Sequence, residues 1–331
     1  MTSHQECWVL VTGASGRVGS RLATTLAGSG HRVRGLVRDA ASADWLSHRS
    51  VEPVVRDVSL PPTIRPAVEG SEVVYNAMGV PEQWRADVGA FDRVNAEGTA
   101  ALVEAARSTG VRRLVHLSTI DVFDAAAAET FDETRLATGP KRTAYQRSKQ
   151  RAEEIVLSAP GSLEVVVVNS AAVIGGRARA QSLEHQLFLP LVRGRLPLLP
   201  PGALNVVGIE SLVTGLIMAA ERGAPGERYI LSDGYVTIRG LARLVLDRAG
   251  RQRLPPTLPA GPARVLSRLA ESASRVTRRR PLLSAGQLEV LLWGARADAA
   301  KAERELLWQQ ASISRAVSEA LEELAGVGRK R

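Results

Sequence analysis

A glycine pattern between the first predicted strand and the first predicted helix constrains the fold most. Trp8–Thr12 is an apolar run typical of a buried strand, and it leads into TGASGRVG, in which Gly13, Gly16 and Gly19 are three residues apart. Gly13 permits a tight turn, and Gly16 lets the backbone approach a pyrophosphate at the positive end of a helix. Gly19 lets that helix pack closely on the strand. A strand before the pattern and a helix after it favour a dinucleotide site over an ordinary glycine-rich turn.

The first half of the chain alternates apolar runs with amphipathic segments, the clearest helices being Val18–Ala27 and Ala96–Thr109. The apolar runs are continuous, as in parallel strands that are covered on both faces. The predicted strands are Trp8–Thr12, Val33–Arg38, Val51–Arg56, Val73–Asn76, Leu114–Ser118 and Val165–Asn169. This order predicts an α/β fold with a doubly wound parallel Rossmann sheet.

After Asn169 the rhythm changes to a smaller, mixed and mainly helical lobe. We expect this lobe to cap the carboxyl edge of the sheet, where ligands bind in such folds. The predicted domains are therefore 1–169, which binds the nucleotide and carries the catalytic groups, and 170–331, which binds the substrate. Segments within 204–249 are expected to return to the main domain. The elements predicted in this half are Leu183–Arg193, Glu210–Glu221 and Ile238–Ala249 as helices, and Leu204–Val207 and Glu227–Leu231 as strands.

Composition excludes several classes of protein. The 331 residues contain no apolar run of membrane-span length, one cysteine (Cys7), and a start without a basic region, so we expect a cytoplasmic protein with no signal peptide. The net charge is +9, but only four of the 43 basic residues are lysine and aromatic residues make up 4%. That composition argues against nucleic-acid binding. Because no His, Cys, Asp or Glu cluster has metal-ligand spacing, no metal is expected.

The end of the second strand indicates which cofactor is bound. In the segment RGLVRDA the strand tip, where NAD-binding enzymes carry an acidic residue for the ribose hydroxyls, is Val37, and the next residue is Arg38. A guanidinium there suits a 2′-phosphate, so the sequence favours NADP(H) over NAD(H). Arg17, within the glycine loop, is expected on the same side. Asp39 offers two alternatives, a contact with the ribose or an ion pair with an arginine.

A second motif carries the chemistry. In Tyr145-Gln-Arg-Ser-Lys149 the phenol and the ammonium lie on one face of a helix, so the lysine is expected to lower the pKa of the tyrosine. Such a phenol can give a proton to a carbonyl as hydride arrives, or take one from an alcohol. Thr119, at the end of the Leu114–Ser118 strand, could hydrogen-bond to the substrate oxygen.

These motifs together resemble the extended short-chain dehydrogenase/reductase family over nearly the whole chain. TGASGRVG, VNAEGTAALVEAARSTGVRRLVHLST and YQRSK carry the likeness. Within the family, LVRD, GERYILSDGYVTIRGLARL and PLLS…ADAAKAERELLW look most like the dihydroflavonol-4-reductase and 3β-hydroxysteroid-dehydrogenase branch. The resemblance implies a triad in which Thr119 binds the substrate oxygen, Tyr145 transfers the proton, and Lys149 holds the ribose and tunes the tyrosine.

The resemblance also implies that Asp57 and Val58 meet the adenine edge, and that Asn95 is structural and braces the active-site strand. The full set of expected cofactor contacts is Gly13, Ser15, Gly16, Arg17, Val18, Arg38, Asp57, Val58, Asn76, Ala77, Gly79, Tyr145 and Lys149. The chain departs from the family at Thr119, where many relatives have serine, at Asn169-Ser170, where an Arg-Pro is usual, and in NVVGIESL. These departures weaken any transfer of substrate identity.

Substrate contacts are expected from Trp84, Asp121, His185 and Gln186. Phe91 is a further candidate for the pocket, and Arg177 and Arg179 could bind a phosphate or carboxylate. His116, inside an apolar strand, is expected to be buried and hydrogen-bonded.

The segment 264–280 holds six arginines and one acidic residue, Glu271. Val265, Leu266, Leu269, Ala273 and Val276 recur at helical spacing on one side. One alternative is a lid over an apolar pocket. Another is a cationic face for an acyl-carrier protein, coenzyme A or a membrane surface. The favoured interpretation is a surface helix whose apolar stripe packs on the core.

The leading functional hypothesis is an NADPH-dependent reductase, reversibly a dehydrogenase, of a sizeable apolar ketone or specialised metabolite. The alternatives are a nucleotide-sugar epimerase or dehydratase with retained NAD(H), and a non-catalytic NADP(H)-binding protein. A homodimer through the helices at 96–109 and 145–157 is a further expectation.

Overall fold

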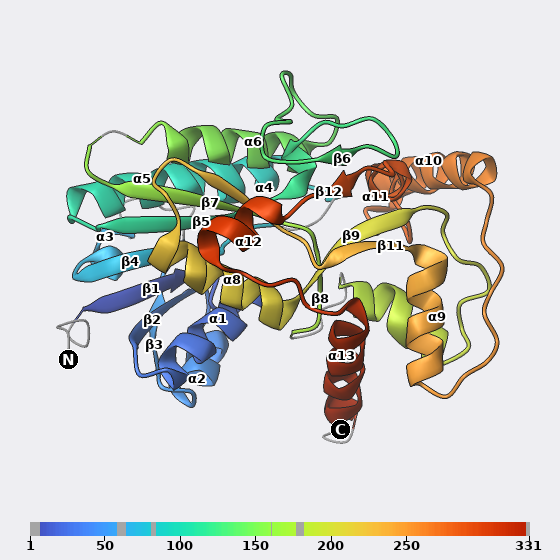
Figure 1. Cartoon of the computed structure of the whole chain (residues 1–331), viewed down its shortest axis with the longest axis horizontal. Helices are drawn as coiled ribbons and strands as arrows, with labels where there is room; N and C mark the ends of the chain where they lie inside the picture. The colour runs from blue at the N-terminus through green and yellow to red at the C-terminus, as the bar shows by residue number, and fades with distance from the viewer. Residues whose placement is uncertain (1–6, 58–63, 81–83, 160, 177–181, 329–331) are drawn as a thin grey trace.

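The computed structural model describes residues 7–57, 64–80, 84–159, 161–176 and 182–328. Seven strands form one parallel sheet: β1 (Trp8–Thr12), β2 (Arg32–Val37), β3 (Val51–Val55), β4 (Ser71–Asn76), β5 (Arg113–Thr119), β7 (Glu164–Ser170) and β10 (Arg228–Leu231). They lie in the order β10-β7-β5-β4-β1-β2-β3, so the chain winds outward from β1 in both directions (Figure 1). The predicted doubly wound Rossmann sheet is confirmed.

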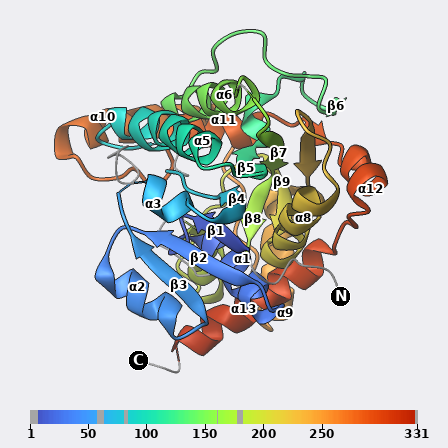
Figure 2. The same cartoon turned by 90° about the vertical axis from the view of Figure 1, so that its left-hand side faces the viewer.

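Helices cover both faces of this sheet (Figure 2). On one face lie α1 (Arg17–Gly28), α2 (Ala40–Ser47) and α8 (Ile209–Arg222). On the other lie α3 (Arg65–Val68), α5 (Gly98–Ser108) and α6 (Ala144–Leu157). The strands are buried almost without interruption along β1, β5 and β7, which is why the sequence shows apolar runs instead of alternation.

The predicted strands agree with the structure to within one or two residues. The helix expected at Ala96–Thr109 differs, because a π-helical turn, η2 (Asp92–Glu97), precedes α5 and follows the short α4 (Gly89–Phe91). Such π-helical turns are frequent at functional sites. Here the turn carries Asn95.

The second half of the chain builds a smaller lobe on the carboxyl edge of the sheet. Its three-stranded sheet has the order β11-β9-β8, and a two-residue strand pairs with β6. The strands of the small sheets are β8 (Ala172–Ile174), β9 (Ala203–Gly208), β11 (Gly234–Thr237) and β12 (Arg296–Ala297), together with β6 (Thr130–Phe131) from the first half of the chain. Two short turns are η3 (Ile120–Val122), a 3-10 turn after β5, and η4 (Glu184–Phe188), a π turn in the lobe. The helices of the lobe are α7 (Leu189–Val192), α9 (Ile238–Arg248), α10 (Ala260–Thr277), α11 (Ala285–Leu292), α12 (Ala300–Leu306) and α13 (Ile313–Gly328).

Part of this half rejoins the large sheet: β10 pairs with β7, and α8 packs beneath β5 and β7. The lobe has its own core between α7, α9, α13 and the small sheet. The domain division at residue 169 stays a prediction. In the part of the chain that the structure describes, no helix is both long enough and apolar enough to cross a bilayer.

The favoured interpretation of the arginine-rich segment is wrong. This segment forms α10, but its large apolar side chains face outward, whereas the side chains that α10 buries are small ones, Ala263, Ser267 and Ser274. The apolar stripe therefore does not pack on the core.

Candidate active site

Thr119, Tyr145 and Lys149 come together at the carboxyl end of β5. Thr119 is the last residue of that strand, and the other two lie one turn apart in the first half of α6. A capping box fixes the start of α6. The Thr143 hydroxyl accepts from the backbone nitrogen of Gln146, and the side-chain oxygen of Gln146 accepts from the backbone nitrogen of Thr143. The hydroxyls of Tyr145 and Thr119 are hydrogen-bonded to each other.

The pKa of Tyr145 is raised well above its ordinary value. Burial is the main cause, because it disfavours the phenolate, and the negative charge of Asp121 acts in the same direction. The hydrogen bond from Thr119 opposes both effects. The prediction that Lys149 lowers this pKa is wrong for this structure, because burial and Asp121 raise it and the opposing effect comes from Thr119. The site therefore holds a neutral phenol, which is a proton donor.

Lys149 is also buried. Its Nζ donates to the backbone oxygen of Leu117 at 2.9 Å. Burial lowers the pKa of this ammonium to about 8, while the carboxylate of Glu153 raises it. The ammonium is thus mostly charged at neutral pH, although its pKa lies only slightly above neutrality.

The glycine loop has the geometry of a dinucleotide cradle. Gly13 has φ +63°, and a Cβ there would lie 2.7 Å from the oxygen of Ala77. Gly16 caps α1 without a side-chain hydrogen bond, so the first turn of the helix is not closed by a side chain. Next to the triad, Gly79 is exposed, and a Cβ there would lie 3.6 Å from Nζ of Lys149. No side chain therefore projects from residue 16 at the helix end or from residue 79 beside the lysine, which fits a dinucleotide lying across the sheet edge.

At the tip of β2 the side chain of Asp39 has a role that was not among the two considered for it. Its side chain caps α2 by accepting from the backbone nitrogen of Ser42 at 2.8 Å. Arg38 is exposed at the same tip. Asp57 is exposed after β3, and Val58 lies outside the described residues.

Arg17 does not stand open beside Arg38. Its Nε donates to the backbone oxygen of Gly175 at 2.5 Å, and its Nη2 forms an ion pair with the Oε1 of Glu184 at 2.5 Å. Burial lowers the pKa of this guanidinium, and Glu184 opposes that effect. The side chain thus ties the glycine loop to the second lobe. Ser15 and Val18, on either side of it, are half-buried in the same loop.

Asn76 is fully buried, and its side chain is used within the protein. Its Oδ1 accepts from the hydroxyl of Thr12 at 2.9 Å, and its Nδ2 contacts the hydroxyl of Thr99 at 3.1 Å and Nδ1 of His116 at 2.9 Å. His116 is buried and hydrogen-bonded as expected, and burial lowers its pKa well below the ordinary value. Of the predicted contacts after β4, Ala77 and Gly79 are the more accessible ones.

Asn95 connects the loop after β4 to α6. Its Oδ1 accepts from the backbone nitrogen of Val80 at 2.8 Å, and its Nδ2 donates to the hydroxyl of Ser148 at 2.9 Å. The residue braces the helix that carries Tyr145 and Lys149, where the sequence had suggested a brace on the strand.

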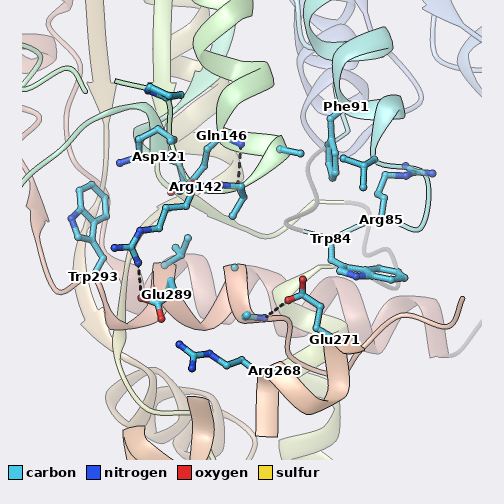
Figure 3. Close-up of a pocket in the computed structure, with 18 of the residues that line it drawn as sticks. Trp84, Arg85, Phe91, Asp121, Arg142, Gln146, Arg268, Glu271, Glu289 and Trp293 are labelled. Atoms are coloured by element: carbon cyan, nitrogen blue, oxygen red, sulfur yellow. Dashed lines mark hydrogen bonds and ion pairs between the residues drawn. The ribbon is translucent and has the colours of Figure 1, made fainter. Parts of the chain in front are cut away.

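A cavity of about 1500 Å³ reaches this site from the side of the second lobe (Figure 3). Asp121, Ala144 and Gln146 are among its lining residues and lie next to Thr119 and Tyr145 in the chain. Trp84 and Phe91 form one wall, and residues of α10 and α11 form the floor. The ring of Phe91 stands edge-on to that of Tyr145, with the ring centroids 6.2 Å apart. The cavity therefore lies beside the two hydroxyls, although the residues that carry them do not line it.

Two of the four predicted substrate residues, Trp84 and Asp121, line this cavity. His185 and Gln186 lie on η4 near Arg17, and neither is among the lining residues. Arg177 and Arg179 lie outside the described residues. Within the described part of the chain, no group of three His, Cys, Asp or Glu side chains could hold a metal ion.

The sequence reasoning missed a buried network behind the triad. The Nδ2 of Asn169 donates to the backbone oxygen of Thr119 at 3.1 Å and to Glu153 at 2.6 Å, and Glu153 pairs with Arg228 at 2.8 Å. Glu153 falls four residues after Lys149 on the same helix face, a signal that the sequence did contain. The polar cavity residues of α10 and α11 were missed because nothing in the sequence connects them with Tyr145.

The fold and this site define a Rossmann-type protein of the extended short-chain dehydrogenase/reductase class. The chain belongs to the NAD dependent epimerase/dehydratase family, whose model matches residues 9–229. The family depends on a nicotinamide dinucleotide, so the predicted class, an NAD(P)-dependent oxidoreductase acting on CH–OH or C=O groups, is confirmed.

Similar proteins give the same picture. The chain is 30% identical to sterol demethylase protein B of Methylococcus capsulatus over 90% of this chain and 92% of that protein. It is 30% identical to 4-hydroxy-2-methyl-3-oxo-4-farnesyl-3,4-dihydroquinoline-1-oxide ketoreductase of Stigmatella aurantiaca, over 86% of each. The crystal structure of gox2253 superposes with a TM-score of 0.81 at 27% identity, covering 98% of this chain and 99% of the other.

Proposed function

We propose that the protein is an NADPH-dependent reductase of a sizeable ketone with an apolar body, and reversibly a dehydrogenase of the corresponding secondary alcohol. The observation that carries the proposal is the hydrogen-bonded pair of hydroxyls, Thr119 and Tyr145, whose chain neighbours Asp121 and Ala144 line the large cavity. This pair can bind a carbonyl oxygen and protonate it.

The protein's own residues divide the work as follows. Thr119 orients the substrate oxygen, and Tyr145, which is neutral because burial raises its pKa, gives that oxygen its proton. The nicotinamide, when bound, supplies the hydride to the carbonyl carbon. Lys149, one turn along α6, carries the positive charge that favours the phenolate left behind. Asn95 holds α6 in register through Ser148.

Arg38 is the basis for proposing NADPH. It is an exposed guanidinium at the tip of β2, while the neighbouring carboxylate of Asp39 is occupied as a helix cap. A 2′-phosphate at this position would gain a charge-assisted hydrogen bond, and the strand ends on Val37 without the acidic residue that NAD-specific enzymes use.

The size and the walls of the cavity support a bulky substrate. About 1500 Å³ exceeds an ordinary small-ligand pocket, and Trp84, Phe91, Val290 and Trp293 supply apolar side chains within a lining that also holds charged ones. Two similar proteins are named for large apolar compounds, a farnesyl-bearing ketone in one and a 3-beta-hydroxysteroid in the other.

The test follows absorbance at 340 nm with purified protein, NADPH or NADH, and a panel of ketones with apolar bodies. We expect net NADPH consumption that Tyr145→Phe lowers by about a thousandfold, as for loss of a general acid. Tyr235→Phe, which removes a phenol from β11, is the matched control and should keep wild-type rates. No consumption with either cofactor, together with NAD(H) that co-purifies with the protein, would refute the proposal in favour of a redox-neutral epimerase.

A further inference from the structure

Helix α10 has the reverse of the amphipathic pattern that a surface helix normally shows. Surface helices bury large apolar side chains and expose polar ones. In α10 the buried side chains are Ala263, Ser267 and Ser274. The large apolar residues on α10 and just after it are exposed: Val265 58%, Leu266 55%, Leu269 62%, Val276 85% and Leu282 99%. We call these five residues the α10 face.

The α10 face stands at the periphery of the molecule, at the edge farthest from β3 (Figure 1). Its members on the helix follow the spacing that keeps them on one side of α10, opposite the buried residues. A contiguous row of large apolar side chains in water is unfavourable, and such patches usually mark a contact surface.

Charge narrows the choice of partner. The segment 264–280 holds six arginines against one acidic residue, and among them Arg279 is exposed, as is Arg264, whose Nε also lies 3.8 Å from the carboxylate of Glu289 on α11. The acidic residue of the segment, Glu271, points toward the cavity and accepts a hydrogen bond from the backbone of Ala285. A second copy of this face would bring two arginine-rich surfaces together and would be repelled. The partner must be negatively charged.

The same partner must also accept apolar side chains along the whole helix. An acidic carrier protein would pair with the arginines but would leave most of the exposed valines and leucines in water. A bilayer with anionic headgroups satisfies both requirements, because apolar side chains enter the acyl boundary while arginines stay among the phosphates. We propose that the α10 face docks the protein on an anionic lipid surface.

Docking by α10 also suggests where the substrate enters the protein, an inference that rests on the proposed function. The inner side of the same helix lines the cavity through Arg268, Glu271 and Ser274. Val88, which also lines the cavity, is 57% exposed, so the cavity opens to the surface. A protein docked by α10 would hold the cavity wall against the membrane, where a lipophilic ketone is concentrated.

Co-sedimentation of the full chain with vesicles tests the docking without any turnover. We expect binding to phosphatidylcholine vesicles that contain about 30% phosphatidylglycerol, and at least about tenfold weaker binding to pure phosphatidylcholine. Raising NaCl from about 0.1 M to about 0.5 M should weaken binding further, because salt screens the arginines.

Two double variants separate the two contributions. Leu266→Gln/Leu269→Gln should weaken vesicle binding by about twentyfold through lost apolar burial. Arg264→Gln/Arg279→Gln should weaken it by about the same factor through lost charge. The matched control, Arg239→Gln/Arg243→Gln, removes two exposed arginines from α9 and should bind like wild type.

Thermal melting shows that each variant is folded, and reduction of a water-soluble ketone should stay at the wild-type rate because none of these residues lines the cavity. The proposal is overturned if the protein does not sediment with anionic vesicles, or if the α9 control loses binding as strongly as the α10 variants. It is also overturned if the α10 face instead mediates a dimer, seen as a mass by light scattering that Leu266→Gln/Leu269→Gln halves. Failure of ketone reduction alone would count against the proposed function and not against the docking.

Discussion

Lys149→Met should make the protein more stable while it removes activity. The buried ammonium of Lys149 has a pKa of about 8 in the folded protein, against an ordinary value of 10.5. Folding therefore has to hold a charge where burial disfavours it. Methionine has a similar unbranched shape and carries no charge, so the substitution removes this cost.

The magnitude follows from the two pKa values. Their difference corresponds to about 3 kcal/mol of destabilisation at neutral pH, where both states are protonated. The lost hydrogen bond to the oxygen of Leu117 offsets about 1 kcal/mol. Glu153 keeps its contacts with Asn169 and Arg228, so no carboxylate is left without a partner. The net gain is about 2 kcal/mol, or about 3 °C in Tm for a chain of this length.

The pH dependence gives the assay its specificity. Between about pH 8 and 10.5 the unfolded state keeps the Lys149 proton while the folded state loses it, so wild-type stability from this group rises with pH. The advantage of Lys149→Met should thus shrink by about 2 kcal/mol between about pH 7 and pH 9.5. Thermal melts of both proteins at the two pH values measure it, and Lys301→Met, which removes a lysine paired with Glu227 near the surface, is the control.

Turnover completes the experiment. Lys149→Met should lower kcat by orders of magnitude, since the phenolate would lose its cation. A variant that melts below wild type at neutral pH, or whose advantage does not change with pH, would refute the reasoning about the buried charge. Near-normal turnover would refute the role of Lys149 in the reaction.

Further substitutions test the cofactor site and the electrostatics of the phenol. Arg38→Gln should raise the KM for NADPH by about 10- to 100-fold and leave that for NADH nearly unchanged, measured by initial rates. Asp39→Ala should lower stability by about 1 kcal/mol through loss of the α2 cap without changing cofactor preference, which melting and kinetics check together. Gly13→Ala should abolish dinucleotide binding, by fluorescence titration, because residue 13 has φ +63° and no room for a Cβ. Asp121→Asn should move the ascending limb of the alcohol-oxidation pH profile, where activity rises as the general base loses its proton, to lower pH, because the negative charge of Asp121 raises the pKa of Tyr145. An unchanged cofactor preference in Arg38→Gln, or a changed one in Asp39→Ala, would contradict the roles given to these two residues. Tight dinucleotide binding by Gly13→Ala, or an unmoved pH profile in Asp121→Asn, would contradict the roles given to Gly13 and Asp121.

Local sequence patterns were enough to predict the central sheet and the position of its reactive groups. Continuous apolar runs predict buried parallel strands because period and burial are local properties, and the strand ends then place Thr119 and the glycine loop at one edge. The four-residue spacing of Tyr145 and Lys149 predicts a shared helix face for the same reason.

The partners and pKa values of the polar side chains could not be predicted in this way, because they depend on residues that are distant in the sequence and meet only in the folded protein. Arg17 pairs with Glu184, 167 residues away, and Asn76 bonds His116 inside the core. The pKa of Tyr145 depends on burial and on Asp121, and local spacing with Lys149 does not reveal either. The stripe on α10 is the plainest case. Helical periodicity shows that its apolar residues share a face, but which way that face turns is set by packing against α11 and the cavity, which are contacts between segments that the sequence does not relate.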